Sequence, residues 1–140
     1  MLQIRDLRFK AIVWGVLVDT VGTLVVALAL FQALAAAGMS EADIIARMHG
    51  VSGLLLMLIL GLGFTLIGGY VAGRTAGRLE ILHGAIVAGI GMVLGLFFRE
   101  PGLPLWYEAI SFAAMVPIGM AGGYIAREDN LKRNAQNSSR

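Results

Sequence analysis

The sequence predicts an all-α membrane protein with four transmembrane helices. Of its 140 residues, 58% are hydrophobic and only 14% are charged, and the mean hydropathy is +0.80. A soluble domain usually has about 25% charged residues, and a soluble chain this short cannot bury so much apolar surface. The apolar residues also gather in four runs, each near the roughly 17–25 residues that a helix needs to cross the hydrocarbon core. These observations predict one polytopic domain in a bilayer.

The four apolar runs are joined by short polar links. We expect membrane spans at about 11–34, 50–71, 81–98 and 105–125. Pro101 and Pro104 interrupt any continuous helix between the third and fourth spans, because proline lacks the N–H group that helical hydrogen bonding needs. The transmembrane domain is therefore predicted over residues 1–128. The polar segment 129–140 is expected to be a cytoplasmic tail that frays or is disordered.

The link between the first two spans contains the start of a helix. Ser40 and Asp43 have the spacing of an N-terminal capping pattern, and Gly38 suits the end of the preceding helix. We expect a helix that begins near Glu41 and continues into the second span.

The distribution of Lys and Arg predicts the orientation. Nine of these residues lie at the N-terminus, in the link 73–80 and in the C-terminal tail, and the other side has only Arg47 and Arg99. By the positive-inside rule, both termini are cytoplasmic. Because the basic residues lie at helix ends, they are typical of membrane topology and not of nucleic-acid binding. Anionic lipid headgroups are the expected contacts of three of them, namely Arg74, Arg78 and Arg127.

The 19 glycines predict close helix packing. In membranes, small residues four positions apart let helix backbones approach one another. The positions expected at such contacts are Gly61, Thr65, Gly69, Gly73, Gly91, Gly95, Gly119 and Gly123. The contacts can lie within one chain or between chains of an oligomer.

A short motif occurs twice. Gly-Gly-Tyr-(Val/Ile)-Ala ends the second span at 68–72 and the fourth span at 122–126. Two interpretations stay open. The chain consists of two related helical hairpins, inserted the same way up as parallel repeats, or the match reflects the limited set of residues that apolar helices use.

Asp19 interrupts the first span, nine residues after Lys10. At 1.5 Å per residue it lies about 13 Å deep, close to the midplane. An ionised carboxylate there costs about 2.5–3.5 kcal/mol on insertion scales. Asp19 is therefore either a proton or cation site, or a contact with a partner subunit, or a hydrogen-bonded Asp satisfied by Thr20, Thr23 or a hydroxyl on a neighbouring helix. The chain places no basic residue at the same depth.

A second polar group is predicted near the outer ends of the spans. His49, Glu108 and Ser111 either form a small cluster there or are simply solvated at the interface. Catalysis is not expected. The absence of cysteine excludes thiol and Cys-based metal chemistry, His49 and His83 lie on opposite sides of the membrane, and the sequence has no nucleophilic triad. We expect no metal and no cofactor.

The stretch 68–85 resembles a pattern in small bacterial four-helix membrane proteins of unknown function. In those proteins a Gly-Gly-aromatic-x-Ala-Gly-basic motif ends the second span, here at 68–74, and a glycine, here Gly84, opens the third. The resemblance implies a multi-pass protein of the bacterial inner membrane and implies no activity.

The sequence thus favours a non-enzymatic integral membrane protein, an accessory or scaffold subunit of a homo-oligomer or of a larger membrane complex. The alternative is a small proton- or cation-linked transporter or channel that uses Asp19. An enzyme acting on lipids is a third interpretation, but the sequence has no recognisable catalytic set for it.

Overall fold

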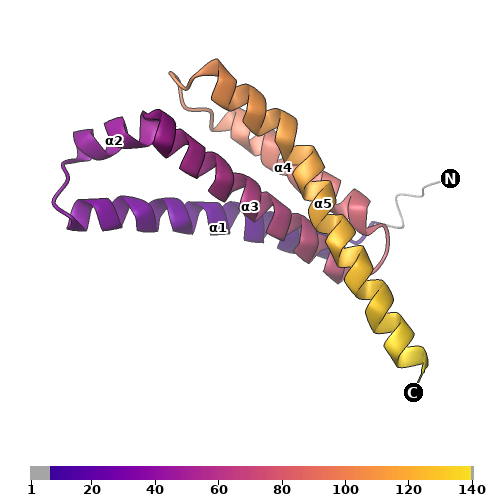
Figure 1. Ribbon diagram of the computed structural model, residues 1–140. Coiled ribbons are helices and arrows are strands. Elements are labelled where there is room, and N and C mark those ends of the chain that lie inside the picture. The colour runs from indigo at the N-terminus through magenta and orange to yellow at the C-terminus, as the bar shows by residue number, and fades with distance from the viewer. Residues whose placement is uncertain (1–6, 140) are drawn as a thin grey trace.

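The computed structural model describes residues 7–139, and these residues form helices and no strand. Four of the helices are long and apolar enough to cross a membrane. The five helices are α1 (Phe9–Ala36), α2 (Glu41–His49), α3 (Val51–Ala76), α4 (Glu80–Phe97) and α5 (Leu105–Ser138) (Figure 1). The predicted all-α, four-span architecture is confirmed.

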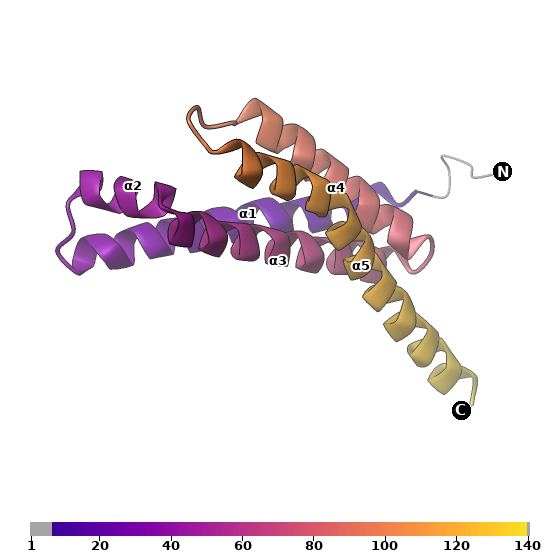
Figure 2. The ribbon, with the colours of Figure 1, turned by 45° about the horizontal axis from the view of Figure 1, so that its top comes forward.

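The bundle has two different ends. The start of α1, the turn between α3 and α4, and the C-terminal part of α5 lie at one end, which we call the basic end. The link between α1 and α2, α2 itself and the link 98–104 lie at the other, the α2 end (Figure 1). The four long helices meet toward the basic end, whereas α1 and α3 diverge from α4 and α5 toward the α2 end (Figures 1 and 2).

Most of the buried residues lie in the half of the bundle next to the basic end, and only Ile44, Gly53, Leu54 and Glu108 of the described residues are buried at the α2 end. In the described chain, no residue of α1 beyond Asp19 is buried, and in α4 burial ends at Ala88, the middle of the helix. The apolar core at this end is built around Ile12, Ala72 and Val87, one residue from each of α1, α3 and α4. The long helices are therefore packed more tightly in this half than toward the α2 end.

Glycine backbones make the closest contacts in this half. A methyl carbon in place of a hydrogen at Gly84 would lie 2.1 Å from the Gly119 carbonyl oxygen, and one at Gly69 would lie 2.3 Å from the same atom. At Gly122 it would lie 2.1 Å from the Leu66 carbonyl oxygen. Only glycine allows such an approach, so α5 packs between α3 and α4 by backbone contact.

Another glycine pair joins α1 to α3. A methyl carbon at Gly15 would lie 2.7 Å from the Gly68 carbonyl oxygen, and one at Gly68 would lie 2.7 Å from the Gly15 carbonyl oxygen. This contact fixes the rotation of α1. Asp19 comes one turn after Gly15, so its side chain is directed into the bundle.

The repeated motifs do not have equivalent surroundings. Gly68 faces α1 and Gly69 faces α5, whereas Gly122 faces α3 and Gly123 faces α4. If the hairpin of α4 and α5 repeated the hairpin of α1 and α3, Gly122 of α5 would face α4, just as Gly68 of α3 faces α1. The glycines of both motifs therefore allow close helix packing, but they pack against different helices.

The helix predicted to begin near Glu41 is present as α2. Ser40 caps it and accepts a hydrogen bond from the Asp43 amide at 3.2 Å, and Gly38 has a φ of +86° after the end of α1. The structure differs from the prediction at Gly50, whose extended backbone separates α2 from α3. The break makes a kink between α2 and α3 (Figures 1 and 2), where a methyl carbon at Gly53 would lie 2.4 Å from the Arg47 carbonyl oxygen.

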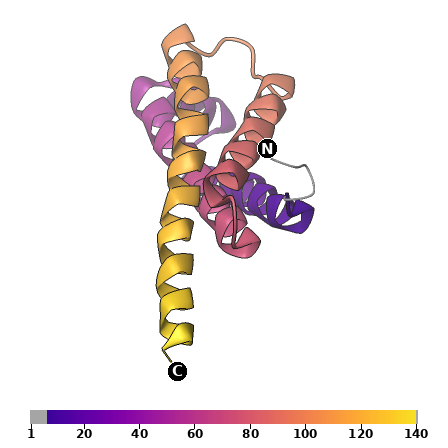
Figure 3. The same cartoon turned by 90° about the vertical axis from the view of Figure 1, so that its right-hand side faces the viewer.

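The predicted disordered tail is helical instead, because α5 continues through Ser138 and projects beyond the other helices (Figure 3). Side chains beyond residue 128 dock on the bundle. Buried Asn130 donates to Glu80 Oε1 at 3.1 Å, and Tyr70 donates its hydroxyl to Asp129 Oδ2 at 2.9 Å. Residue 128 is therefore not a structural boundary.

Replacing Gly84 by alanine is expected to lower the free energy of unfolding by about 1–3 kcal/mol, because the added methyl group overpacks the contact with Gly119. Thermal or SDS-induced unfolding in detergent micelles measures the change. Gly89→Ala, in the same helix, is the control: nothing lies within 4 Å of the added carbon, so this variant should be as stable as the wild type or more so. Equal losses for both variants would contradict the proposed contact.

Candidate functional site

Asp19 lies inside the bundle and does not face lipid. Only 6% of its surface is exposed. A methyl carbon at Gly68 of α3 would lie 2.9 Å from Asp19 Cβ, and one at Gly91 of α4 would lie 3.0 Å from Asp19 Oδ2. The two glycines thus let α3 and α4 close around the carboxyl group.

The carboxyl group has one hydrogen-bond partner among the described residues, Thr65. The Thr65 hydroxyl lies 3.1 Å from Asp19 Oδ1. Oδ2 makes no hydrogen bond within residues 7–139, and it is not sealed from solvent. One carboxyl oxygen is therefore held, and the other is free to accept a ligand.

The hydroxyls that the sequence suggested on α1 do not reach this carboxyl group. Thr23 donates to the Asp19 backbone carbonyl at 2.8 Å, and Thr20 makes no hydrogen bond within the described chain. In a helix, a threonine hydroxyl readily bonds the carbonyl four residues earlier. That local geometry occupies Thr23 and leaves the carboxyl group to the neighbouring helix.

A cavity of about 410 Å³ extends from Asp19 toward the α2 end. Polar groups line it near Asp19 and again near the start of α5, where Tyr107 and Ser111 lie. At about 30 Å³ per water molecule, the cavity has room for several beside these polar groups, although apolar residues make up most of the lining. The lining residues are Asp19, Thr23, Met57, Leu58, Gly61, Leu62, Thr65, Gly95, Phe98, Tyr107, Ser111 and Met115.

Two of the glycines predicted to pack helices leave this cavity open instead. Nothing lies within 4 Å of a methyl carbon placed on Gly61, and at Gly95 the nearest atom is an ordinary contact with Phe112 at 3.6 Å. The other predicted glycines lie at helix contacts or, in the case of Gly91, against Asp19. A missing side chain permits either close approach or open space, and the crossing of the helices decides which.

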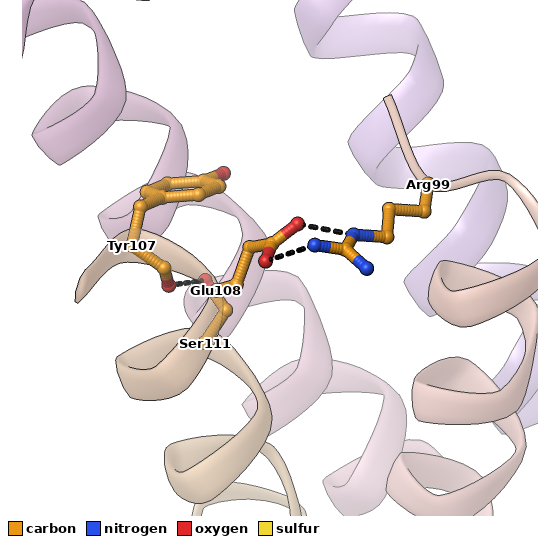
Figure 4. A network of polar contacts seen from close by, with 4 residues as sticks. All are labelled: Arg99, Tyr107, Glu108 and Ser111. Carbon is orange, nitrogen blue, oxygen red and sulfur yellow. Dashed lines mark hydrogen bonds and ion pairs between the residues drawn. The ribbon is translucent and has the colours of Figure 1, made fainter. Parts of the chain in front are cut away.

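Glu108, predicted to belong to a polar cluster, is paired with Arg99. The guanidinium donates from Nε and Nη2 to the two carboxylate oxygens at 2.5 and 2.6 Å (Figure 4). Ser111 donates to the backbone carbonyl of Tyr107 at 2.7 Å. The ion pair thus ties the link after α4 to the first turn of α5, next to the cavity residues Phe98 and Tyr107.

His49 is separate from this ion pair. Its Nε2 lies 3.4 Å from Glu100 Oε1, and both side chains are largely exposed. The three residues of the expected cluster therefore do not contact one another: His49 pairs with Glu100, Glu108 pairs with Arg99, and Ser111 bonds the Tyr107 backbone. The sequence analysis did not identify the partners Glu100 and Arg99, because it used the charges of the link 98–104 only to predict the orientation in the membrane.

His83 has a structural role at the basic end. It is fully buried, Nε2 accepts a hydrogen bond from the Arg8 amide at 3.0 Å, and Nδ1 donates to the Leu79 carbonyl at 2.9 Å. Both ring nitrogens are thereby satisfied. Residues 7–139 contain no group of three His, Cys, Asp or Glu side chains that suits a metal ion.

The three arginines predicted at lipid headgroups all lie at the basic end. Arg74 lies near the end of α3, Arg78 in the turn before α4, and Arg127 on α5. Arg127 borders a largely apolar cavity of about 500 Å³ between α4 and α5, together with Leu79, Glu80, Ile81, Leu82, Ala85 and Met120.

Comparisons with protein-family models, with curated proteins and with solved structures gave no match to this chain.

Replacing Glu108 by glutamine is expected to lower the free energy of unfolding by about 1 kcal/mol, because the variant loses a bidentate ion pair in which Arg99 is half exposed. Thermal unfolding in micelles measures the loss. The matched control is His49→Gln, which breaks a solvated pair and should leave stability unchanged. A similar loss in both variants would show that the buried position of Glu108 is irrelevant.

Proposed function

We propose that the protein is a non-enzymatic membrane protein that binds a proton or a small cation at Asp19, as a small transporter or channel or as a subunit of one. The observation that carries the proposal is the position of the carboxyl group. It is buried among three membrane-spanning helices, one oxygen is held by Thr65, and the cavity reaches it from the α2 end.

The charge of the site supports this proposal. An isolated carboxylate in hydrocarbon is costly, and intramembrane acids usually belong to ion or proton pathways. No Lys, Arg or His lines the cavity around Asp19 within the described chain. A bound proton or cation would neutralise the carboxylate where the protein itself supplies no positive charge.

The shape of the bundle gives the proposed pathway a direction. The concentration of Lys and Arg at the basic end favours a cytoplasmic location for that end. The cavity would then open to the outside of a bacterial inner membrane. The tightly packed half between Asp19 and the basic end closes the path on the other side, as expected for one state of an alternating-access cycle.

A second candidate function is that of an accessory or scaffold subunit in a homo-oligomer or larger complex. The α2-end half favours it, because within the described residues α1 has no buried residue beyond Asp19 and its backbone stays apart from that of α5. Leu24, Val25 and Leu28 are exposed there. These faces can be covered by lipid or by another subunit, and anionic lipids are the expected contacts of Arg74, Arg78 and Arg127.

Asp19→Asn tests the first candidate. In liposomes that contain a pH-sensitive dye for protons or a cation-sensitive dye for cations, flux should fall at least tenfold, because the amide cannot release a proton or balance a cation. Thr20→Val, one residue away and without a role at the carboxyl group, should keep the wild-type rate. Unchanged flux in Asp19→Asn would remove Asp19 from the pathway.

The mass of the same variants in nanodiscs separates the two candidates. An oligomer that dissociates on Asp19→Asn would assign Asp19 to an assembly contact and support the scaffold function. An unchanged mass combined with lost flux would support the transport function.

A further inference from the structure

The Thr65 hydroxyl has two acceptors within reach and one proton to donate. Its oxygen lies 3.1 Å from Asp19 Oδ1 and 3.1 Å from the Gly61 carbonyl oxygen. A threonine hydroxyl can donate only one hydrogen bond at a time. The direction of that bond must therefore depend on the state of the carboxyl group.

The two states of Asp19 require different arrangements. An ionised carboxylate is the stronger acceptor, so it takes the Thr65 proton and leaves the Gly61 carbonyl without this bond. A protonated carboxyl group can itself donate to the Thr65 oxygen, and the Thr65 proton then points to Gly61. Ionisation of Asp19 thus presents two oxygens with free lone pairs at one place, from the carboxylate and from Gly61.

We infer that Asp19, Thr65 and Gly61 form a binding site for one small monovalent cation of the Na⁺ class, which exchanges with the proton of Asp19. This inference deepens the proposed function and rests on it. Carboxylate, hydroxyl and carbonyl oxygens are the ligands that hard cations prefer. One carboxylate balances one positive charge, whereas a divalent ion would leave an uncompensated charge inside the membrane.

The spacing of the oxygens agrees with a small ion. The Thr65 oxygen lies 3.1 Å from each of the other two. In octahedral coordination, neighbouring oxygens are about 3.0 Å apart when the ion–oxygen distance is about 2.1 Å and about 3.5 Å apart when it is about 2.5 Å, so the observed spacing favours a small ion over a large one. Gly61 has open space where a side chain would stand, and the cavity of about 410 Å³ can supply water as the remaining ligands.

The exchange conserves charge and atoms. Asp19 releases H⁺ into the cavity as the cation binds, and it takes up H⁺ when the cation leaves. No covalent bond other than the O–H bond of the carboxyl group is made or broken. Among the described lining residues, Tyr107 on α5 is the other ionisable group, and those from α3 and α4 carry none.

Proton release on addition of salt tests the exchange. NaCl added to the purified protein in weakly buffered detergent should release protons from the wild type and from Thr65→Ser, which keeps the hydroxyl. Asp19→Asn should release none, and in Thr65→Val the Na⁺ concentration for half-release should rise at least tenfold. Thr20→Val should match the wild type, and thermal unfolding should show that each variant is folded.

The salts used as controls make the outcomes distinct. The inferred site is supported if NaCl releases protons and if KCl, choline chloride and MgCl₂ at equal ionic strength do not. Equal release by all four salts overturns it, as does normal Na⁺ sensitivity in folded Thr65→Val. A proton flux in liposomes that needs Asp19 but ignores Na⁺ overturns the inference and leaves the proposed function standing. Flux independent of Asp19 overturns both.

Discussion

Backbone contact between glycines at the basic end is the constraint on which the other features depend. Helices in a bilayer gain no hydrophobic free energy by associating with one another, so they rely on close packing and interhelical hydrogen bonds. Gly15 and Gly68 supply this packing between α1 and α3, and Gly69, Gly84 and Gly119 supply it around α5. These contacts fix the rotation of each helix, and they therefore decide which polar side chains are directed inward.

In the other half, no described glycine meets the backbone of another long helix in this way, and the openness of that half follows from the same residue type. Gly61 and Gly95 lie where the helices diverge, so their missing side chains add space to the cavity. The protein consequently has a closed half and an open half along its length. Asp19 lies at the boundary between them, held by Thr65 on one side and exposed to the cavity on the other. This position, more than the presence of an acid in a span, gives the proposed ion site its physical basis.

Several elements were predictable because their signals are local. The four spans and the cap at Ser40 follow from hydropathy and from spacing within a few residues. The helical end of α5 was not predictable from its polar composition, because Asn130 is buried only through contacts with Glu80 and Gly73, which are distant in sequence. The pairing of Glu108 with Arg99 across the link 98–104 likewise depends on how the chain turns there.

The sequence by itself determined that four helices are long and apolar enough to cross a membrane and that one carboxyl group lies within the first of them. Both facts depend only on the order of residues along a helix, whose rise per residue is fixed. Only the tertiary structure decided which hydroxyl bonds Asp19, which glycines pack and which leave space, and where the cavity opens. The physical reason is that stripes of small residues permit several helix rotations and crossing angles. The contacts of the whole bundle select one of them.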